Sequence, residues 1–278
     1  MNRVKQLVKL FNQRKMNLEE TCAQVVELSK IVGSFLESKV NHLTDEMISS
    51  KAHMDFVTEI DKESEVRLVE GLSKILPEAG YIAEEGTSTK KGDRYNWIID
   101  PIDGTTNFIH GVIPFCISLA LQDNDKLVMG IIYDPIQKEC FYAWESGGAW
   151  LNGTPIEVSS KKKLSHSLIA TGFPYTDFSL IDEYMASLRD LMTCTHGVRR
   201  LGSAAMDLAY VACGRFDAFY EYHLQPWDVA AGSVLVKEAG GNVCDFKGGD
   251  NYLFGENYIC SNGHIHTEFL DLLRKHFN

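Results

Sequence analysis

Trp97-Ile98-Ile99-Asp100-Pro101-Ile102-Asp103-Gly104-Thr105-Thr106-Asn107-Phe108 is the stretch of this chain that says most about its fold. The apolar start predicts the end of a buried β-strand, and Pro101 predicts that this strand does not continue as a central ladder. Gly104 permits a tight turn, and the two threonines after it are suited to beginning a helix. The stretch therefore predicts a strand–turn–helix junction that carries two carboxylates, Asp100 and Asp103.

Two carboxylates beside the start of a helix are suited to binding charged groups. Carboxylate oxygens are the hard ligands that Mg²⁺ prefers, and the free N–H groups of a first helical turn attract anions. Together they predict a phosphoryl-transfer site. The alternative is an ordinary turn, because Asp-Pro-x-Asp-Gly is rich in turn-forming residues. Further acids elsewhere in the chain decide between the two.

The string Asp100-Pro-Ile-Asp103-Gly-Thr-Thr-Asn resembles the signature of the inositol monophosphatase family, which comprises Mg²⁺-dependent, lithium-sensitive phosphatases of sugars and polyols. The resemblance extends from about Met16 to Phe277. It implies an α/β (α+β) fold of stacked α-β-α-β-α layers with the active site between two halves, and a homodimer. We accordingly expect an N-terminal lobe over 16–160 and a C-terminal lobe over 161–278, packed as one unit, after an N-terminal extension or extra helix over 1–15.

Two acidic motifs upstream of the signature also match the family. Glu84 follows a short strand where family members have a Gly-Glu-Glu-type turn whose first Glu is a metal ligand; here Ala83 replaces the glycine. Asp61 ends a segment similar to the family motif Asp-x-Val-Thr-x-x-Asp, whose second Asp pairs with the first Thr of the signature. Thr58-x-x-Asp61 is also a capping-box pattern, and the two roles are compatible.

Three motifs in the second half complete the match. Trp227-Asp228-Val-Ala-Ala-Gly232 corresponds to Trp-Asp-x-Ala-Ala-Gly, whose Asp completes a metal site, although Asp228 also has the position expected of a helix N-cap. Glu221 matches the acid that holds a substrate hydroxyl in the inositol enzymes, with an exposed strand-end carboxylate as the alternative. Gly202-Ser203-Ala204 falls where the family has its substrate loop.

Four carboxylates at one place would repel one another unless cations were bound between them. By resemblance, Glu84, Asp100 and the Ile102 carbonyl hold one Mg²⁺, Asp100, Asp103 and Asp228 hold a second, and a third, weaker ion lies near Glu84. Thr105 and Asp61 activate the attacking water, so Asp61, Thr105 and Glu84 are the expected catalytic residues. The expected substrate-binding residues are Asp103, Gly104, Thr105, Thr106, Gly202, Ser203, Ala204, Glu221 and Asp228.

The expected reaction is Mg²⁺-dependent hydrolysis of a small phosphate monoester, with myo-inositol monophosphate as the first choice. Gly-Thr-Thr-Asn-Phe favours this over nucleotide phosphatase relatives, which more often have Gly-Thr-Lys-Glu. Fructose-1,6-bisphosphatase or another sugar or nucleotide phosphatase of the superfamily remains the alternative enzyme. An alternative of another class is a regulatory binding partner of transcription or ribosome-assembly machinery, because some bacterial relatives have such a role.

Charge, apolar runs and cysteine content indicate which partners and which compartment suit the chain. A net charge of −11 argues against direct nucleic-acid binding. Apolar runs such as 127–133 are too short to span a bilayer, and the start of the chain lacks the pattern of a signal peptide. Seven cysteines without a Cys-x-x-Cys pair predict reduced thiols, so we expect a cytoplasmic protein.

Hydrophobic periodicity predicts a mixed α/β chain with helices between sheets. We expect His264 and His266, which lie outside the matched motifs, to be a surface pair rather than metal ligands. Helices are predicted over 18–40, 61–76, 180–194, 204–212, 229–238 and 266–277. Strands are predicted over 81–83, 97–99, 115–121, 127–133, 139–144, 167–172, 217–222 and 257–260, those between 115 and 144 forming an antiparallel meander.

Overall fold

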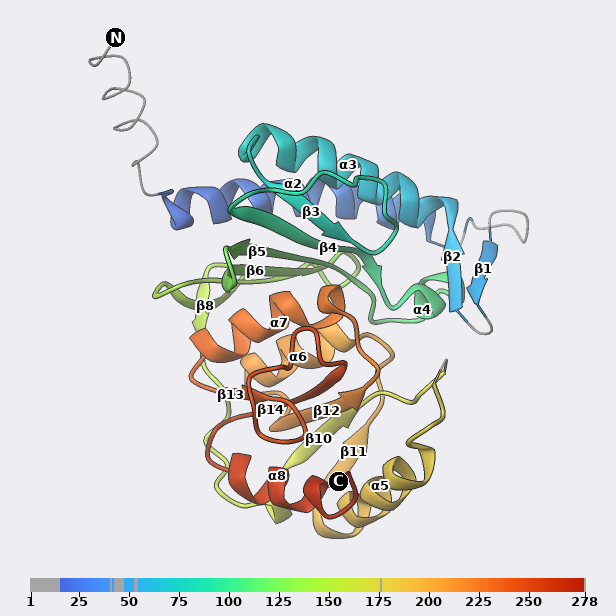
Figure 1. The fold of residues 1–278 in the computed structure, drawn as a ribbon, viewed down its shortest axis with the longest axis vertical. Coiled ribbons are helices and arrows are strands. Elements are labelled where there is room, and N and C mark those ends of the chain that lie inside the picture. The colour runs from blue at the N-terminus through green and yellow to red at the C-terminus, as the bar shows by residue number, and fades with distance from the viewer. Residues whose placement is uncertain (1–15, 41, 43–47, 53–54, 176, 278) are drawn as a thin grey trace.

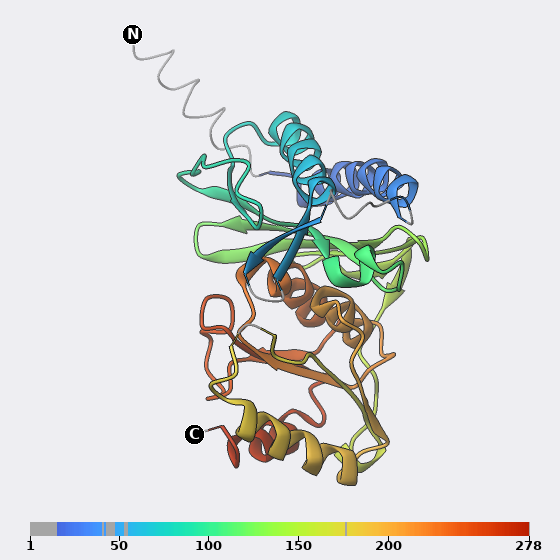
Figure 2. The same cartoon turned by 90° about the vertical axis from the view of Figure 1, so that its right-hand side faces the viewer.

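The computed structural model describes residues 16–40, 42, 48–52, 55–175 and 177–277, with backbone alone over 48–52 and 55–58. The expected extension or extra helix over 1–15 lies outside the described residues. Helices and sheets alternate in five layers, α-β-α-β-α, from one end of the molecule to the other (Figures 1 and 2). The layered fold implied by the family resemblance is therefore confirmed.

A seven-stranded sheet forms the second layer, and helices α2 (Leu18–Lys39) and α3 (Glu59–Ile75) cover its outer face (Figure 1). Strand β3 is parallel to β4, and every later neighbour is antiparallel, so the expected meander is present. In sheet order the strands are β3 (Gly80–Ala83), β4 (Tyr95–Asp103), β5 (Cys116–Asp123), β6 (Lys126–Asp134), β7 (Glu139–Trp144), β8 (Gly148–Leu151) and β9 (Thr154–Ile156).

A five-stranded sheet forms the fourth layer. Helices α6 (Ala204–Ala212) and α7 (Pro226–Glu238) lie between the two sheets, and α5 (Ile181–Cys194) and α8 (His266–Arg274) cover the far face (Figure 1). In sheet order the strands are β11 (Gly197–Arg199), β10 (Leu168–Thr171), β12 (Ala218–Tyr222), β14 (Asn257–Ser261) and β13 (Asn242–Cys244).

Three hydrophobic clusters fill the spaces between the layers. One joins α2 and α3 to the first sheet, one surrounds α6 and α7, and one lies under α5 and α8. Helices α6 and α7 are apolar on nearly all sides because both of their faces meet a sheet. The sheet and α7 approach each other closely at Gly130 of β6, where a Cβ would come within 2.3 Å of the Ala231 carbonyl oxygen of α7.

Strand β4 differs from the expectation at Pro101. The strand does not end at Ile99 but continues through Asp103, and only the pairing with β5 is interrupted, between Asp100 and Asp103. Proline has no N–H to donate, and the register shift accommodates that loss without ending the strand. Both carboxylates consequently belong to the strand itself, and the following helix α4 (Thr105–Ile109) is a short one.

Helix α7 begins earlier than predicted. Pro226 is its first residue and Gln225 its N-cap, so Asp228 is the third helical residue and not the cap. The Asp228 side chain nevertheless helps to cap the helix, because Oδ2 accepts a hydrogen bond of 2.7 Å from the Gln225 N–H. Pro226 suits the first helical position because the N–H that it lacks has no partner there.

Periodicity did not predict several short elements. They are the hairpin β1 (Ile48–Ala52) and β2 (Asp55–Thr58), the one-turn helix η2 (Leu164–His166), and the three-residue strands β9, β11 and β13. The prediction that His264 and His266 are both surface residues is correct for His264 alone. His264 is exposed, but His266 is partly buried and lies 2.9 Å from the Ser261 hydroxyl and 3.4 Å from the Cys244 sulfur. The cysteines are all free thiols.

Candidate active site

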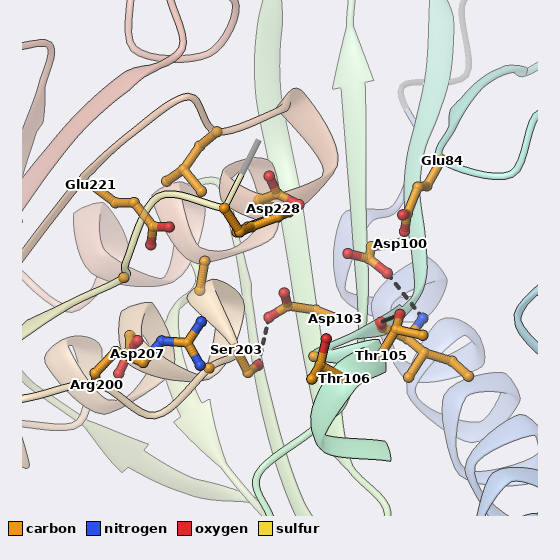
Figure 3. Close-up of a pocket in the computed structure, with 17 residues that line it drawn as sticks. Glu84, Asp100, Asp103, Thr105, Thr106, Arg200, Ser203, Asp207, Glu221 and Asp228 are labelled. Carbon is orange, nitrogen blue, oxygen red and sulfur yellow. Dashed lines mark hydrogen bonds between the residues drawn. The ribbon is translucent and has the colours of Figure 1, made fainter. Parts of the chain in front are cut away.

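A cavity of about 250 Å³ lies where the two sheets and the middle helices meet (Figure 3). Six of its lining residues are acids and one is a base, Arg200. The cavity collects parts of the chain that are far apart in sequence, namely the end of β4, the loop after β3, the starts of α6 and α7, and the end of β12. Every predicted site residue except Asp61 lines it.

Asp100, Asp103 and Asp228 converge at the centre of this cavity. One carboxylate oxygen of each lies within 4.8 Å of the others. Asp100 is held by a hydrogen bond of 2.9 Å from the Ile102 N–H to its Oδ1, a consequence of the interrupted pairing in β4. Three carboxylates at this spacing are a suitable set of hard oxygen ligands for a divalent cation.

The buried position of these acids raises their pKa values. Burial is the largest cause for Asp100, Asp103 and Asp228, and repulsion between neighbouring carboxylates adds to it for Asp100 and Asp228. Such a cluster is unfavourable when all its members are ionised, and a bound cation removes that cost. The donor set therefore fits Mg²⁺, which takes oxygen ligands.

Asp103 is fixed from the other half of the molecule. Its Oδ2 accepts hydrogen bonds from the Ser203 hydroxyl at 2.5 Å and from the Ala205 N–H at 2.7 Å, and the Cys116 thiol lies 3.8 Å away. Ser203 is also the N-cap of α6, since its hydroxyl accepts from the Met206 N–H at 3.4 Å. The same side chain thus begins a helix and orients a carboxylate. The bonds from Ser203 and Ala205 both reach Oδ2 of Asp103.

Glu84 stands apart from the three-carboxylate cluster but lies on the same side as Asp100 (Figure 3). Its negative charge contributes to the raised pKa of Asp100. The loop that carries Glu84 is tied to α3 by Glu65, a buried residue. Glu65 accepts hydrogen bonds of 2.7 Å from the N–H groups of Glu85 and Thr87 and from the Thr87 hydroxyl.

Thr105 and Asp61 form a pair next to the cluster. The Thr105 hydroxyl lies 3.0 Å from Asp61 Oδ1 and 3.0 Å from the Ile102 carbonyl oxygen. Asp61 is buried behind Thr105 in the first turn of α3. A hydroxyl has one proton, so it donates to one of the two acceptors at a time, and a carboxylate is the stronger acceptor. The Ile102 carbonyl then remains available at the cavity wall.

The far wall of the cavity contains Glu221, Asp207 and Arg200 (Figure 3). Burial raises the pKa of Glu221 to about 8, while Arg200 acts in the opposite direction. Gly172 is required beside Glu221, because a Cβ there would come within 2.0 Å of its carboxylate oxygen. Gly104 adopts a left-handed conformation with φ of 95° and makes the turn from β4 into α4.

Sequence reasoning missed Arg200, Asp207, Gly172, Tyr175 and Leu224, which also line the cavity. A signal existed for Asp207, since it is the only charged residue of the otherwise apolar segment 204–212. Arg200 stands two residues before the Gly202-Ser203-Ala204 motif, so its position in the loop could also have suggested it.

Comparison with known proteins agrees with the fold. The model of the inositol monophosphatase family matches residues 17–277, so the chain belongs to this family of phosphatases. It is 42% identical to the putative Nus factor SuhB of Neisseria meningitidis serogroup B over 82% of this chain and 87% of that protein. It is 38% identical to the inositol-1-monophosphatase of Rhizobium meliloti over 87% and 92% of the two chains.

Solved structures show the same architecture. The extragenic suppressor protein suhB of Bartonella henselae superposes with a TM-score of 0.86 at 38% identity, covering 91% of this chain and 98% of that one. The IMPase of Thermotoga maritima superposes with a TM-score of 0.83 at 39% identity, covering 91% and 96%. None of the described helices is long and apolar enough to cross a membrane.

Proposed function

We propose that this chain hydrolyses a small phosphate monoester, with myo-inositol monophosphate as the preferred substrate and Mg²⁺ as the cofactor. The observation that carries the proposal is the cluster of three carboxylates next to the Thr105–Asp61 pair inside one cavity. The relatives named inositol-1-monophosphatase support the choice of substrate.

The residues that would hold Mg²⁺ are Glu84, Asp100, Asp103, Asp228 and the carbonyl of Ile102. Two to three ions per site agree with the number of oxygen ligands. When bound, the ions would supply Lewis acidity, which lowers the pKa of water and neutralises charge on the phosphate oxygens.

Thr105 and Asp61 provide a route for the proton of the attacking water. When the Thr105 hydroxyl donates to Asp61 Oδ1, its lone pairs face outward and accept a proton from water in the cavity. The proton passes through Oγ1 of Thr105 to Asp61, and the water oxygen attacks phosphorus. The N–H groups at the start of α4, from Thr105 and Thr106, have no acceptor within the helix and are suited to binding the phosphate oxygens.

The position of the attacking water defines where the alcohol departs. Phosphoryl transfer places the attacking and leaving oxygens on opposite sides of phosphorus. Thr105 stands on one side of the cavity and Glu221 on the other, with Asp103 and Asp228 between them (Figure 3). The alcohol part of the ester therefore lies against Glu221.

The test is phosphate release from four esters, with and without Mg²⁺ and with added Li⁺. The esters are inositol 1-phosphate, fructose 1,6-bisphosphate, adenosine 3′,5′-bisphosphate and glycerol 2-phosphate. Mg²⁺-dependent, lithium-sensitive release that favours inositol 1-phosphate is the expected result. A preference for another ester replaces the substrate but keeps the reaction, and release that needs no metal contradicts the proposal.

Asp100→Asn separates the metal site from the fold. Its activity should fall by at least about 10³-fold, because Asp100 belongs to both proposed ligand sets. The exposed Asp125→Asn in the turn between β5 and β6 is the matched control and should retain activity. Normal turnover by the Asp100 variant would refute the assignment of the site.

A second candidate function is that of a Nus factor, because relatives at 36–42% identity bear the names Nus factor SuhB or putative Nus factor SuhB. Such a role requires a surface rather than the metal cluster. A pull-down of transcription or ribosome-assembly factors with the Asp100→Asn variant tests it, since binding that survives the substitution would be independent of catalysis. If neither the wild type nor the variant captures any of these factors, the result argues against this role.

A further inference from the structure

Arg200 is the one basic side chain among the described residues that line the cavity. It lies in the loop between β11 and α6. Its neighbour Arg199 does not line the cavity, and its guanidinium donates instead to the Val198 carbonyl at 3.0 Å. Two arginines adjacent in sequence thus have different surroundings, and only one of them faces the substrate space.

The surroundings of Arg200 hold its guanidinium at the cavity. The guanidinium carbon is 5.5 Å from the centre of the Phe173 ring, a cation–π distance. Gly202 has φ of 89°, and a Cβ there would lie 2.6 Å from Nη1 of Arg200, so glycine keeps that space open. Asn107 donates to the Leu201 carbonyl at 2.9 Å and fixes the backbone between the two.

The guanidinium keeps its donors available. Arg200 forms no ion pair with any described residue, although Asp207 and Glu221 are close enough for its charge to act on both. Asp207 is 1% exposed, and within the described part of the chain its Oδ1 has no hydrogen-bond partner. A buried carboxylate without a full set of partners is costly, so this wall of the cavity is short of donors.

The chemistry of this wall suits the hydroxyl groups of an uncharged polyol. A hydroxyl accepts a hydrogen bond from a guanidinium and donates one to a carboxylate at the same time.

We propose that Arg200 is a specificity-determining residue that binds hydroxyl oxygens of the alcohol part of the ester. This rests on the proposed phosphatase function. It adds the preference for a polyhydroxylated leaving group and assigns that preference to a residue outside the metal cluster.

The experiment compares Arg200→Ala and Arg200→Lys with Arg199→Ala as the matched control. For each variant, kcat and KM are measured with inositol 1-phosphate, and the inhibition constant is measured with inorganic phosphate. Arg200→Ala should raise KM about 10-fold or more, the cost of one charged hydrogen bond, with kcat within about 3-fold of wild type. The KM of Arg200→Lys should lie between those of the wild type and Arg200→Ala. The KM of Arg199→Ala should match that of the wild type.

Inorganic phosphate distinguishes the two ends of the substrate. Its inhibition constant should not change in Arg200→Ala, because phosphate lacks the alcohol part. An equal rise in the KM for inositol 1-phosphate and in the inhibition constant of inorganic phosphate would place Arg200 at the phosphate and overturn the proposal. A variant indistinguishable from Arg199→Ala would overturn it as well.

If the wild type releases phosphate from no ester, the proposed function fails; calorimetric titration of uncleaved inositol 1-phosphate into wild type and Arg200→Ala then decides the role of Arg200 by itself.

Discussion

Glu65 offers a sharp test of how the fold supports the site. Its carboxylate is fully buried at the middle of α3 and accepts three hydrogen bonds of 2.7 Å from residues 85 and 87. These bonds tie down the loop that carries Glu84 into the cavity. Glu65 itself does not line the cavity, so its effect on metal binding would be indirect.

The substitution Glu65→Gln keeps the shape of the side chain but changes one acceptor oxygen into a donor group. If the amide oxygen takes the place of Oε1, the new NH₂ group faces the Glu85 N–H, and one hydrogen bond is lost. The other two lose their ionic character. Hydrogen bonds to a charged group contribute about 1.5–3 kcal/mol each, so the free energy of unfolding should fall by about 2–4 kcal/mol.

Looser support of Glu84 should also weaken Mg²⁺ binding. Residues that orient metal ligands typically affect metal affinity or activity by about 10- to 100-fold. The Mg²⁺ concentration for half-maximal phosphate release should therefore rise by about that factor in Glu65→Gln. Urea denaturation measures the stability, and a Mg²⁺ titration of the activity measures the effect on the site.

Glu63→Gln is the matched control, because Glu63 lies on the same helix but is exposed and pairs with Arg67. Its exposed ion pair should change the free energy of unfolding by about 0.5 kcal/mol at most. A folded Glu65→Gln protein with the Mg²⁺ dependence of the wild type would refute the argument that Glu65 positions Glu84.

Two further predictions concern helix α6 and the contact between β6 and α7. Burial raises the pKa of Asp207, so the folded state keeps a proton that the unfolded state loses, and stability falls as pH rises above the usual value of 3.8. Asp207→Asn removes that loss, and its advantage over wild type in urea should be larger at pH 8 than at pH 5; parallel stability curves would contradict this. Gly130→Ala forces a Cβ against the Ala231 backbone and should lower the free energy of unfolding by at least about 1–3 kcal/mol. An unchanged midpoint of thermal unfolding would show that the two layers separate easily.

Much of the layered fold could be predicted from local patterns. The helices α2, α5 and α6 and the strands from β5 to β7 lie within a residue or two of their predicted positions, because a buried face imposes a clear hydrophobic period. The short strands β9, β11 and β13 have only three residues each, too few for a period to be recognised. They are held by their neighbours in the sheet, and no local pattern specifies that.

The two local errors near the site have a common cause. Proline at position 101 and aspartate at 228 were judged by their usual preferences for strand ends and helix caps. In the structure a register shift lets β4 continue past Pro101, and Pro226 begins α7 before Asp228. Tertiary pairing thus decided the bounds of both elements.

The sequence by itself determined the chemical groups of the site and the order in which the chain supplies them. The acids, the Gly-Thr-Thr turn and the Gly-Ser-Ala loop can be recognised because residue types and short motifs are visible in the sequence without knowledge of the fold. Only the tertiary structure decided that Asp100, Asp103 and Asp228 come within 4.8 Å of one another, that Glu65 ties the Glu84 loop, and that Arg200 rather than Arg199 faces the cavity. Those facts depend on how two sheets and two helices pack, and packing joins residues 100 or more positions apart along the chain.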